Sequence, residues 1–209
     1  MLKRRIKRWV FSFDDLAAWN KGRYDIVKEG NYPAAILFAE SHERPGSMLQ
    51  DQLELISTVR PDFVLHEFMD GLIYDPETKT EVKMPNRRYD HIDLTPGLSG
   101  RPPEEILKLS DEMKFRVVGC DLTNAEEDII IRQLYRRDPS LRRRGGVGLT
   151  QFDPEIMIFR DNKAAQIARM YVGQTKNPVP VIMGEDHIHN IHERQLLKVI
   201  VGYAYLRPI

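Results

Sequence analysis

Four short runs of apolar residues recur along the chain, and polar residues, glycine or proline bound each of them. The runs are nearly continuous rather than alternating, which is typical of strands that are covered on both faces of a parallel sheet. They cover residues 34–39, 62–67, 116–121 and 179–184. A fifth run at 203–206 predicts an edge strand.

Amphipathic segments lie between these runs and carry the start signals of helices. Five pairs of residues supply such signals: Ser47 with Gln50, Pro102 with Pro103, Asn124 with Glu127, Asp153 with Pro154, and Asn190 with Glu193. The alternation of strands and helices predicts an α/β fold with a mostly parallel central sheet and helices on both faces. We expect one domain over residues 1–209.

Two internal stretches lack a clear period, and the N-terminal segment is a third region outside the strand and helix pattern. Residues 70–103 and 136–153 are rich in glycine, proline and charged residues, and we expect long loops there. Residues 1–15 are basic and then briefly apolar, too short for a signal peptide or a membrane span. They favour a basic arm or an edge strand.

The composition indicates an ordinary globular protein. The chain has 209 residues, 31 Lys and Arg against 31 Asp and Glu, and a net charge of zero. This balance argues against a nucleic-acid-binding protein that is basic over its whole surface. The lone cysteine, Cys120, lies in an apolar run and predicts a buried thiol in a reducing compartment, so we expect a cytoplasmic protein.

Polar residues follow the four apolar runs, where open α/β sheets bind ligands. The first run leads into Glu40 and His42, the second ends at Glu67 and the third at Asp121. The fourth is followed by His187. The stretches "AESH" and "GEDH" share one form, in which a small residue and a glutamate precede a histidine after a strand. We therefore expect one joint site, in a cleft at the carboxyl ends of the strands.

Two chemistries suit these residues. A histidine beside a carboxylate can act as a general base, and His42, Glu40, Glu67 and His187 are the candidates. The same residue types can instead bind Zn, Mn or Fe, with His42, Glu67, His187 and His189 as candidate ligands. The residues alone leave both alternatives open.

Arginines supply the cations that such a site could use. Arg160 and Asp161 lie in the expected helix before the fourth strand, and Arg160 could hold a carboxylate or an anionic substrate. The loop arginines Arg142, Arg143 and Arg144 are candidates for contacts with an anionic substrate.

The ordered motifs resemble a known superfamily. The stretches are "FAESH" 38–42, "RPDFVLHEF" 60–68, "GCDLTN" 119–124, "RDNKAAQIA" 160–168 and "MGEDHIHNI" 183–191. This set is similar to the superfamily of erythromycin esterases, haem-binding ChaN lipoproteins and TraB/PrgY/Tiki proteins. The resemblance implies a hydrolase-like pocket in which His42 is the leading base, Glu40, Glu67 and His187 converge, and Arg160 supports them.

One position departs from the pattern of that superfamily. Ala39 stands where the superfamily usually has glycine, and an alanine would be strained there if the turn required a positive φ.

The leading hypothesis is a small hydrolase acting on an ester or peptide-type bond of a small-molecule or peptide substrate, with or without a metal. The alternative from the same residues is a protein that binds a metal or haem without turnover. A third is a nucleic-acid or partner module that uses the basic stretches "LKRRIKR" and "RRDPSLRRRGG", which lack interleaved aromatic residues. A homo-oligomer is compatible with all three.

Overall fold

The computed structural model describes residues 11–40, 45–68, 71–84, 102–143, 149, 153–198, 200 and 202–209. The strands are β1 Tyr24–Gly30, β2 Ala35–Glu40, β3 Phe63–His66, β4 Leu72–Asp75, β5 Thr80–Lys83, β6 Arg116–Gly119, β7 Val179–Gly184 and β8 Gly202–Pro208. The helices are α1 Phe13–Asn20, α2 Pro45–Val59, α3 Glu104–Met113, α4 Asn124–Arg137, η1 Pro139–Arg143, α5 Pro154–Val172 and α6 Glu185–Glu193.

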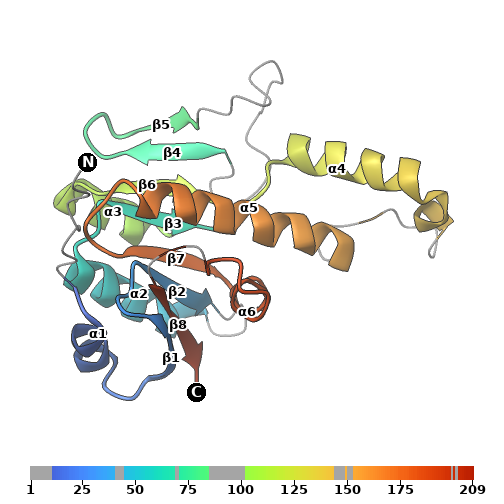
Figure 1. Cartoon of the computed structure of the whole chain (residues 1–209). Coiled ribbons are helices and arrows are strands. Elements are labelled where there is room, and N and C mark those ends of the chain that lie inside the picture. The colour runs from blue at the N-terminus through green and yellow to red at the C-terminus, as the bar shows by residue number, and fades with distance from the viewer. Residues whose placement is uncertain are drawn as a thin grey trace, which may run out of the picture.

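The eight strands form one mixed sheet in the order β1-β8-β2-β7-β3-β6-β4-β5 (Figure 1). The five inner strands, from β8 to β6, run parallel to one another, whereas β1, β4 and β5 pair antiparallel. The predicted α/β class and mostly parallel sheet are confirmed. The strand at the C-terminus is not an edge strand as predicted, because β8 pairs with both β1 and β2.

Alternate residues of the inner strands enter two separate cores. In β2, Leu37 and Ala39 face the core beneath α5 and α6, and Ile36 and Phe38 face the core beneath α1, α2 and α3. All four are fully buried. Burying a large aliphatic or aromatic side chain contributes about 1.5–3 kcal/mol, so this double burial explains the continuous apolar runs.

Ala39 is an ordinary strand residue rather than a strained one. It lies in β2 opposite Met183 of β7, and it is not among the residues with positive φ. The predicted strain is therefore absent.

Two of the expected loops contain regular structure. The stretch 70–103 includes the β4–β5 hairpin, because Leu72 and Tyr74 alternate inward and bury against the sheet. The stretch 136–153 includes the end of α4 and the short helix η1. Of the N-terminal segment, residues 1–10 lie outside the described range, and α1 starts at a capping box between Ser12 and Asp15.

Three expected helix starts are shifted. α2 begins at Pro45, so Ser47 lies inside it. α4 is capped by Thr123 with Glu126, one residue before the expected pair, because the Thr123 hydroxyl accepts from the N–H of Glu126. Asn190 lies inside α6, which begins directly after β7, and residues 194–198 form turns instead of the expected helix.

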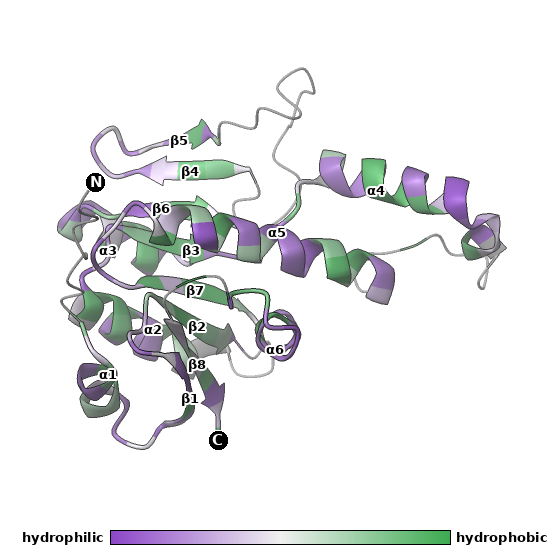
Figure 2. Cartoon of the chain, in the orientation of Figure 1, coloured by the Kyte–Doolittle hydropathy of each residue, from purple (hydrophilic) through white to green (hydrophobic). Residues whose placement is uncertain are grey.

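The helices α4 and α5 extend past the carboxyl edge of the sheet (Figure 1). Figure 2 shows hydrophobic central strands, while α4 alternates between hydrophilic and hydrophobic residues. In the part of the chain that the structure describes, no helix is both long and apolar enough to cross a membrane.

Candidate functional site

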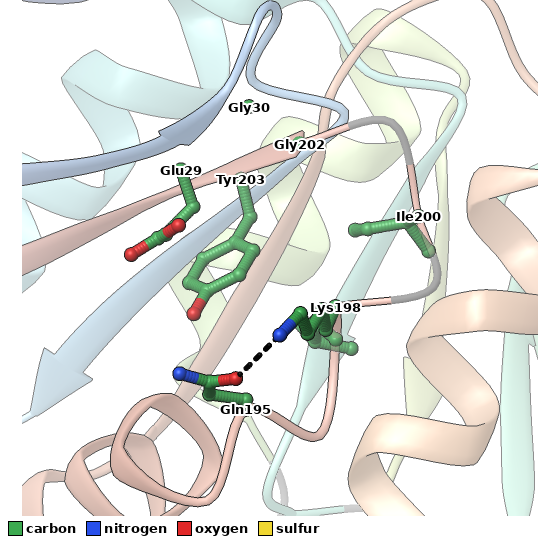
Figure 3. Close-up of a pocket in the computed structure, with 8 residues that line it drawn as sticks. Glu29, Gly30, Gln195, Lys198, Ile200, Gly202 and Tyr203 are labelled. Carbon is green, nitrogen blue, oxygen red and sulfur yellow. Dashed lines mark hydrogen bonds between the residues drawn. The ribbon is translucent and has the colours of Figure 1, made fainter.

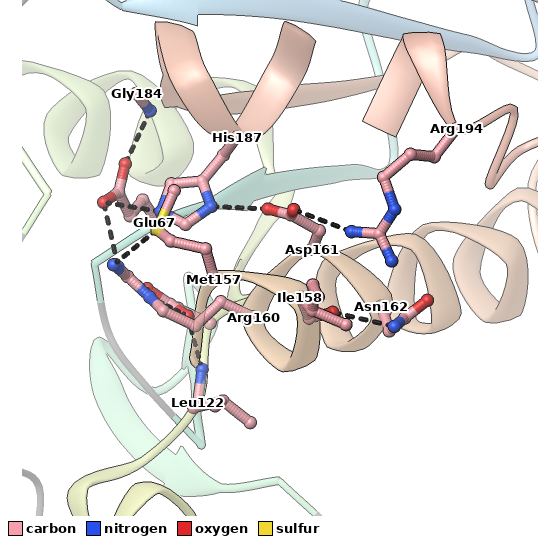
Figure 4. Close-up of polar contacts among 11 residues, drawn as sticks. Glu67, Leu122, Met157, Ile158, Arg160, Asp161, Asn162, Gly184, His187 and Arg194 are labelled. Carbon is pink, nitrogen blue, oxygen red and sulfur yellow. Dashed lines mark hydrogen bonds and ion pairs between the residues drawn. The ribbon is translucent and has the colours of Figure 1, made fainter. Parts of the chain in front are cut away.

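A cluster of buried charged residues lies at the carboxyl ends of β3, β6 and β7, on the side of α5 and α6 (Figure 4). Glu67 directly follows β3, and Asp121 follows β6. His187 lies in the first turn of α6, which begins where β7 ends. α5 crosses these strand ends and contributes Arg160 and Asp161 from its buried face. We call these five residues the strand-tip cluster.

Arg160 is the cation at the centre of the strand-tip cluster. Its Nε donates to both carboxylate oxygens of Asp121 at 2.9 Å, and its Nη2 also pairs with Asp121 Oδ2. The same Nη2 lies 3.2 Å from Glu67 Oε1. The Arg160 and Asp121 side chains are only 8% and 5% exposed, so the two charges depend on each other for stabilisation.

Backbone N–H groups hold the two carboxylates from the other side. Gly184 N donates to Glu67 Oε2 at 2.6 Å, and Leu122 N donates to Asp121 Oδ1 at 2.7 Å. Each oxygen of Asp121 thus accepts two hydrogen bonds, which is about its capacity. Glu67 accepts one bond on each oxygen and keeps acceptor capacity for a further partner.

His187 is oriented by a buried carboxylate. Its Nδ1 lies 2.7 Å from Asp161 Oδ1, and Asp161 is fully buried. Arg194, after the end of α6, donates to Asp161 Oδ2 at 3.1 Å. With Nδ1 engaged by the carboxylate, Nε2 is the nitrogen that remains for chemistry, and it faces Glu67 Oε1 at 3.9 Å.

The gap between His187 Nε2 and Glu67 Oε1 is too long for a hydrogen bond. One water molecule or one metal ion could bridge it, since metal–nitrogen and metal–oxygen bonds are about 2.0–2.2 Å long. One candidate ligand atom each from Glu67, Asp121 and His187 lies within 4.8 Å of the others. Arg160 already engages Asp121 bidentately, so a metal would compete with this guanidinium for the third ligand.

The charges nearly balance. Three carboxylates, Glu67, Asp121 and Asp161, contact two guanidinium groups, those of Arg160 and Arg194. The two guanidinium groups thus offset most of the negative charge of these three carboxylates.

Glu127, on α4, lies near the same cluster. Burial raises the pKa of its carboxyl, the positive charge of Arg160 lowers it, and the negative charge of Asp121 raises it. The net shift is upward. A carboxyl with a raised pKa next to a buried ion pair is a candidate proton carrier.

The structure brings together Glu67, His187 and Arg160 from the predicted set. The predicted base His42 and the predicted substrate contact Arg144 lie outside the described residues. Glu40 ends β2 on the same face as Ile36 and Phe38, by the alternation of the strand, and so faces away from α5 and α6. Its role in a joint site with Glu67 is not supported by this placement.

His189 and Arg142 lie apart from the strand-tip cluster. His189 is exposed on α6, two residues after the buried His187, which does not suit a shared metal site. Arg142 stacks over Tyr135 near the distal end of α4, and Arg143 follows it in η1. A helix of 14 residues is about 20 Å long, so these arginines are remote from the strand tips.

Two contributors were not predicted as site residues, Glu127 and Arg194, and Asp161 had no predicted role. A sequence signal exists for Asp161, because it precedes Ala164 by one helical turn on the apolar face of α5. A charged residue at a core position of an amphipathic helix indicates a buried partner. Glu127 and Arg194 have no such signal, since charged residues are common on helix surfaces.

Comparison with known protein families, characterised proteins and solved structures finds no match to this chain. The resemblance to the erythromycin esterase, ChaN and TraB/PrgY/Tiki superfamily therefore stays a prediction.

Proposed function

We propose that the strand-tip cluster is the reaction centre of a small hydrolase that cleaves an ester or peptide-type bond. The supporting observation is the contact of 2.7 Å between His187 Nδ1 and the buried Asp161. A carboxylate in this position fixes the ring orientation and the tautomer, and it stabilises the imidazolium that forms when the histidine accepts a proton.

In the proposed reaction, His187 acts as the general base. His187 Nε2 takes a proton from a water molecule, whose oxygen attacks the carbonyl carbon of the substrate while the C=O electron pair moves to oxygen. The carbonyl then reforms, the bond to the leaving group breaks, and the leaving group takes the proton from His187. Glu67, 3.9 Å from Nε2, positions the water.

Arg160 supplies the fixed positive charge of the proposed centre. Its guanidinium lies between Asp121 and Glu67 in a largely buried setting, where an electrostatic interaction is stronger than in water. It holds the Glu67 carboxylate in place, and its charge favours the negative oxygen of the tetrahedral intermediate. Glu67 is the most exposed of these three side chains at 12%, so the substrate approaches beside it.

The test uses hydrolysis of p-nitrophenyl acyl esters and a peptide panel. His187→Gln and Asp161→Asn are expected to lower kcat by about 10²–10⁴-fold, because both remove general-base catalysis. His189→Gln is the matched control, since this exposed histidine is on the same helix, and it should retain full activity. His42→Gln tests the base that the sequence favours. Wild-type rates in the His187 and Asp161 variants would refute the proposal.

A second candidate function is metal binding, which the short distances among Glu67, Asp121 and His187 favour. His187 Nε2 and Glu67 would bind the ion, and Asp121 would join only after it leaves Arg160. Titration of the purified protein with Zn²⁺ and Mn²⁺, followed by calorimetry, tests this. Binding that disappears in both Glu67→Gln and His187→Gln supports it, and identical titrations of wild type and variants oppose it.

A further inference from the structure

A cavity lies beside the first residues of β8 (Figure 3). These residues are at the amino end of the parallel strands, whereas the strand-tip cluster lies at their carboxyl ends. It has a volume of about 280 Å³ and lies between the ends of β1 and β8 and the turns that follow α6. Ligand pockets usually measure about 300–1,000 Å³, so this cavity suits a small metabolite rather than a polymer.

The floor of the cavity is built by a close approach of backbone. Gly30 and Gly202 are paired in register where β1 meets β8. A Cβ atom on Gly202 would lie 2.4 Å from Glu29 O and 2.5 Å from Tyr32 O, so this position excludes any side chain. Glycine at this position therefore lets the end of β1 pack directly against the start of β8, beside the cavity.

Tyr203 forms the apolar wall of the cavity. It is only 3% exposed, and its hydroxyl is hydrogen-bonded to His192 Nδ1 at 3.0 Å. Burial, together with the negative charges of Glu29 and Glu193, raises the pKa of Tyr203 to about 12, so the hydroxyl stays neutral. Ile200 adds a second apolar surface.

Two opposite charges flank this wall. Figure 3 shows the Glu29 carboxylate on one side of the Tyr203 ring and the Lys198 ammonium on the other. Lys198 Nζ donates to the neutral Gln195 Oε1 at 3.2 Å, and within the described residues no ion pair joins Lys198 to Glu29. The cavity thus presents a cation and an anion that do not neutralise each other, with an apolar surface between them.

We propose that this cavity binds a small zwitterion of the α-amino-acid class with an apolar side chain. Glu29 pairs with the ammonium group, and Lys198 with the Gln195 amide pairs with the carboxylate. The apolar side chain packs on the partly exposed Ile200 and on the small accessible area of Tyr203. This site lies apart from the strand-tip cluster, and it does not depend on the proposed hydrolase activity.

The test is calorimetric titration of the full chain with three ligands. L-leucine carries both charges, isoamylamine lacks the carboxylate, and isocaproate lacks the ammonium group. L-leucine is expected to bind at least about tenfold more tightly than either analogue, a difference of about 1.4 kcal/mol. Because both charges contribute, Glu29→Gln and Lys198→Met should each weaken L-leucine binding by a similar factor.

Lys83→Met is the matched control, because it removes a lysine from β5 at the other edge of the sheet, and it should bind like the wild type. Glu29 and Lys198 are exposed, so their substitution should not impair folding, which circular dichroism checks. Equal affinity for all three ligands would overturn the proposal, as would unchanged binding in both variants. Failure of L-leucine and every other apolar amino acid to bind at millimolar concentration would also overturn it.

Discussion

His66 and Glu67 are neighbours in the chain, but they lie in contrasting surroundings on opposite faces of the sheet. Glu67 turns to the side of α5 and α6 and joins Arg160 and the N–H of Gly184. His66 turns to the side of α2 and α3 and is fully buried. Its Nδ1 accepts from Phe68 N at 3.2 Å, but its Nε2 has no hydrogen-bond partner among the described residues.

The same contrast extends to the helices above each face. On α5, the buried Arg160 and Asp161 are both paired with charges from other elements. On α2, the fully buried Gln52 has neither its amide nitrogen nor its amide oxygen hydrogen-bonded within the described part of the chain. An unsatisfied buried polar group costs about 1–3 kcal/mol.

This contrast separates the buried polar residues that stabilise the fold from those that do not. Polar groups on the α5 and α6 face are mutually compensated, so removing one leaves a partner unpaired. On the α2 and α3 face, the Gln52 amide and His66 Nε2 lack hydrogen-bond partners within the described residues, so replacing either residue with an apolar one removes a cost. Apolar substitutions of these residues on the two faces should therefore change the free energy of unfolding in opposite directions.

The largest effect is expected at Arg160. Arg160→Met leaves Asp121 and Glu67 as buried carboxylates without their cation, which should lower the free energy of unfolding by about 3–5 kcal/mol. Urea unfolding followed by circular dichroism measures the change. Combining it with Asp121→Asn should restore part of the loss, because one unpaired charge is then removed.

Arg169→Met provides the control for that substitution. Arg169 lies on the same helix and donates one exposed hydrogen bond to Leu196 O. Its loss should change the free energy of unfolding by less than about 1 kcal/mol. If Arg160→Met lowered the free energy of unfolding as little as this control does, the polar groups under α5 would not depend on one another for stability.

The next largest effect is the loss of stability at acidic pH that His66 causes. Burial lowers the pKa of His66 from 6.5 to about 3, so the folded protein keeps this ring neutral while the unfolded chain protonates it. The unfolded state then binds more protons below about pH 6.5, and stability falls as the pH drops from there toward about pH 3. His66→Phe should remove this dependence.

Urea unfolding at about pH 7.5 and about pH 4.5 compares the two proteins. Between these values, wild type should lose about 2–3 kcal/mol more than His66→Phe, since one proton contributes about 1.4 kcal/mol per pH unit. Only the difference between the two pH values counts, because His66→Phe also removes the acceptor for Phe68 N. An identical loss in both proteins would mean that His66 is not a buried neutral histidine.

The strands were predictable because double burial leaves a continuous apolar signature. The runs at residues 34–39 and 179–184 appear as β2 and β7 almost without change. The β4–β5 hairpin was not predictable in the same way, because Val82 and other outward residues of these short strands are polar or exposed. Its position at the sheet edge removes the second buried face that made the inner strands recognisable.

The sequence predicts which strand ends carry the polar residues of the site. It does not predict which of those side chains share one face of the sheet. The sequence places Glu40 and Glu67 at the ends of the first two apolar runs, yet a period of two decides which face each side chain takes. β2 ends with Glu40 in register with Gly184 and on the face of Phe38, whereas Glu67 lies one residue beyond β3 on the other face. Fixing the face requires the exact end of each strand, which composition does not give.

The smallest expected effect is on the α2 face, and it is a gain of stability rather than a loss. Gln52→Met replaces an unsatisfied buried amide with an apolar group of similar length, and it should raise the free energy of unfolding by about 1–2 kcal/mol. Gln50→Met is the matched control, because Gln50 is exposed on the same helix, and its replacement should stay within about 0.5 kcal/mol of wild type. The measurement is urea unfolding at neutral pH. A loss of stability in Gln52→Met would show that this amide makes a stabilising contact, and the α2 face would then resemble the α5 face rather than oppose it.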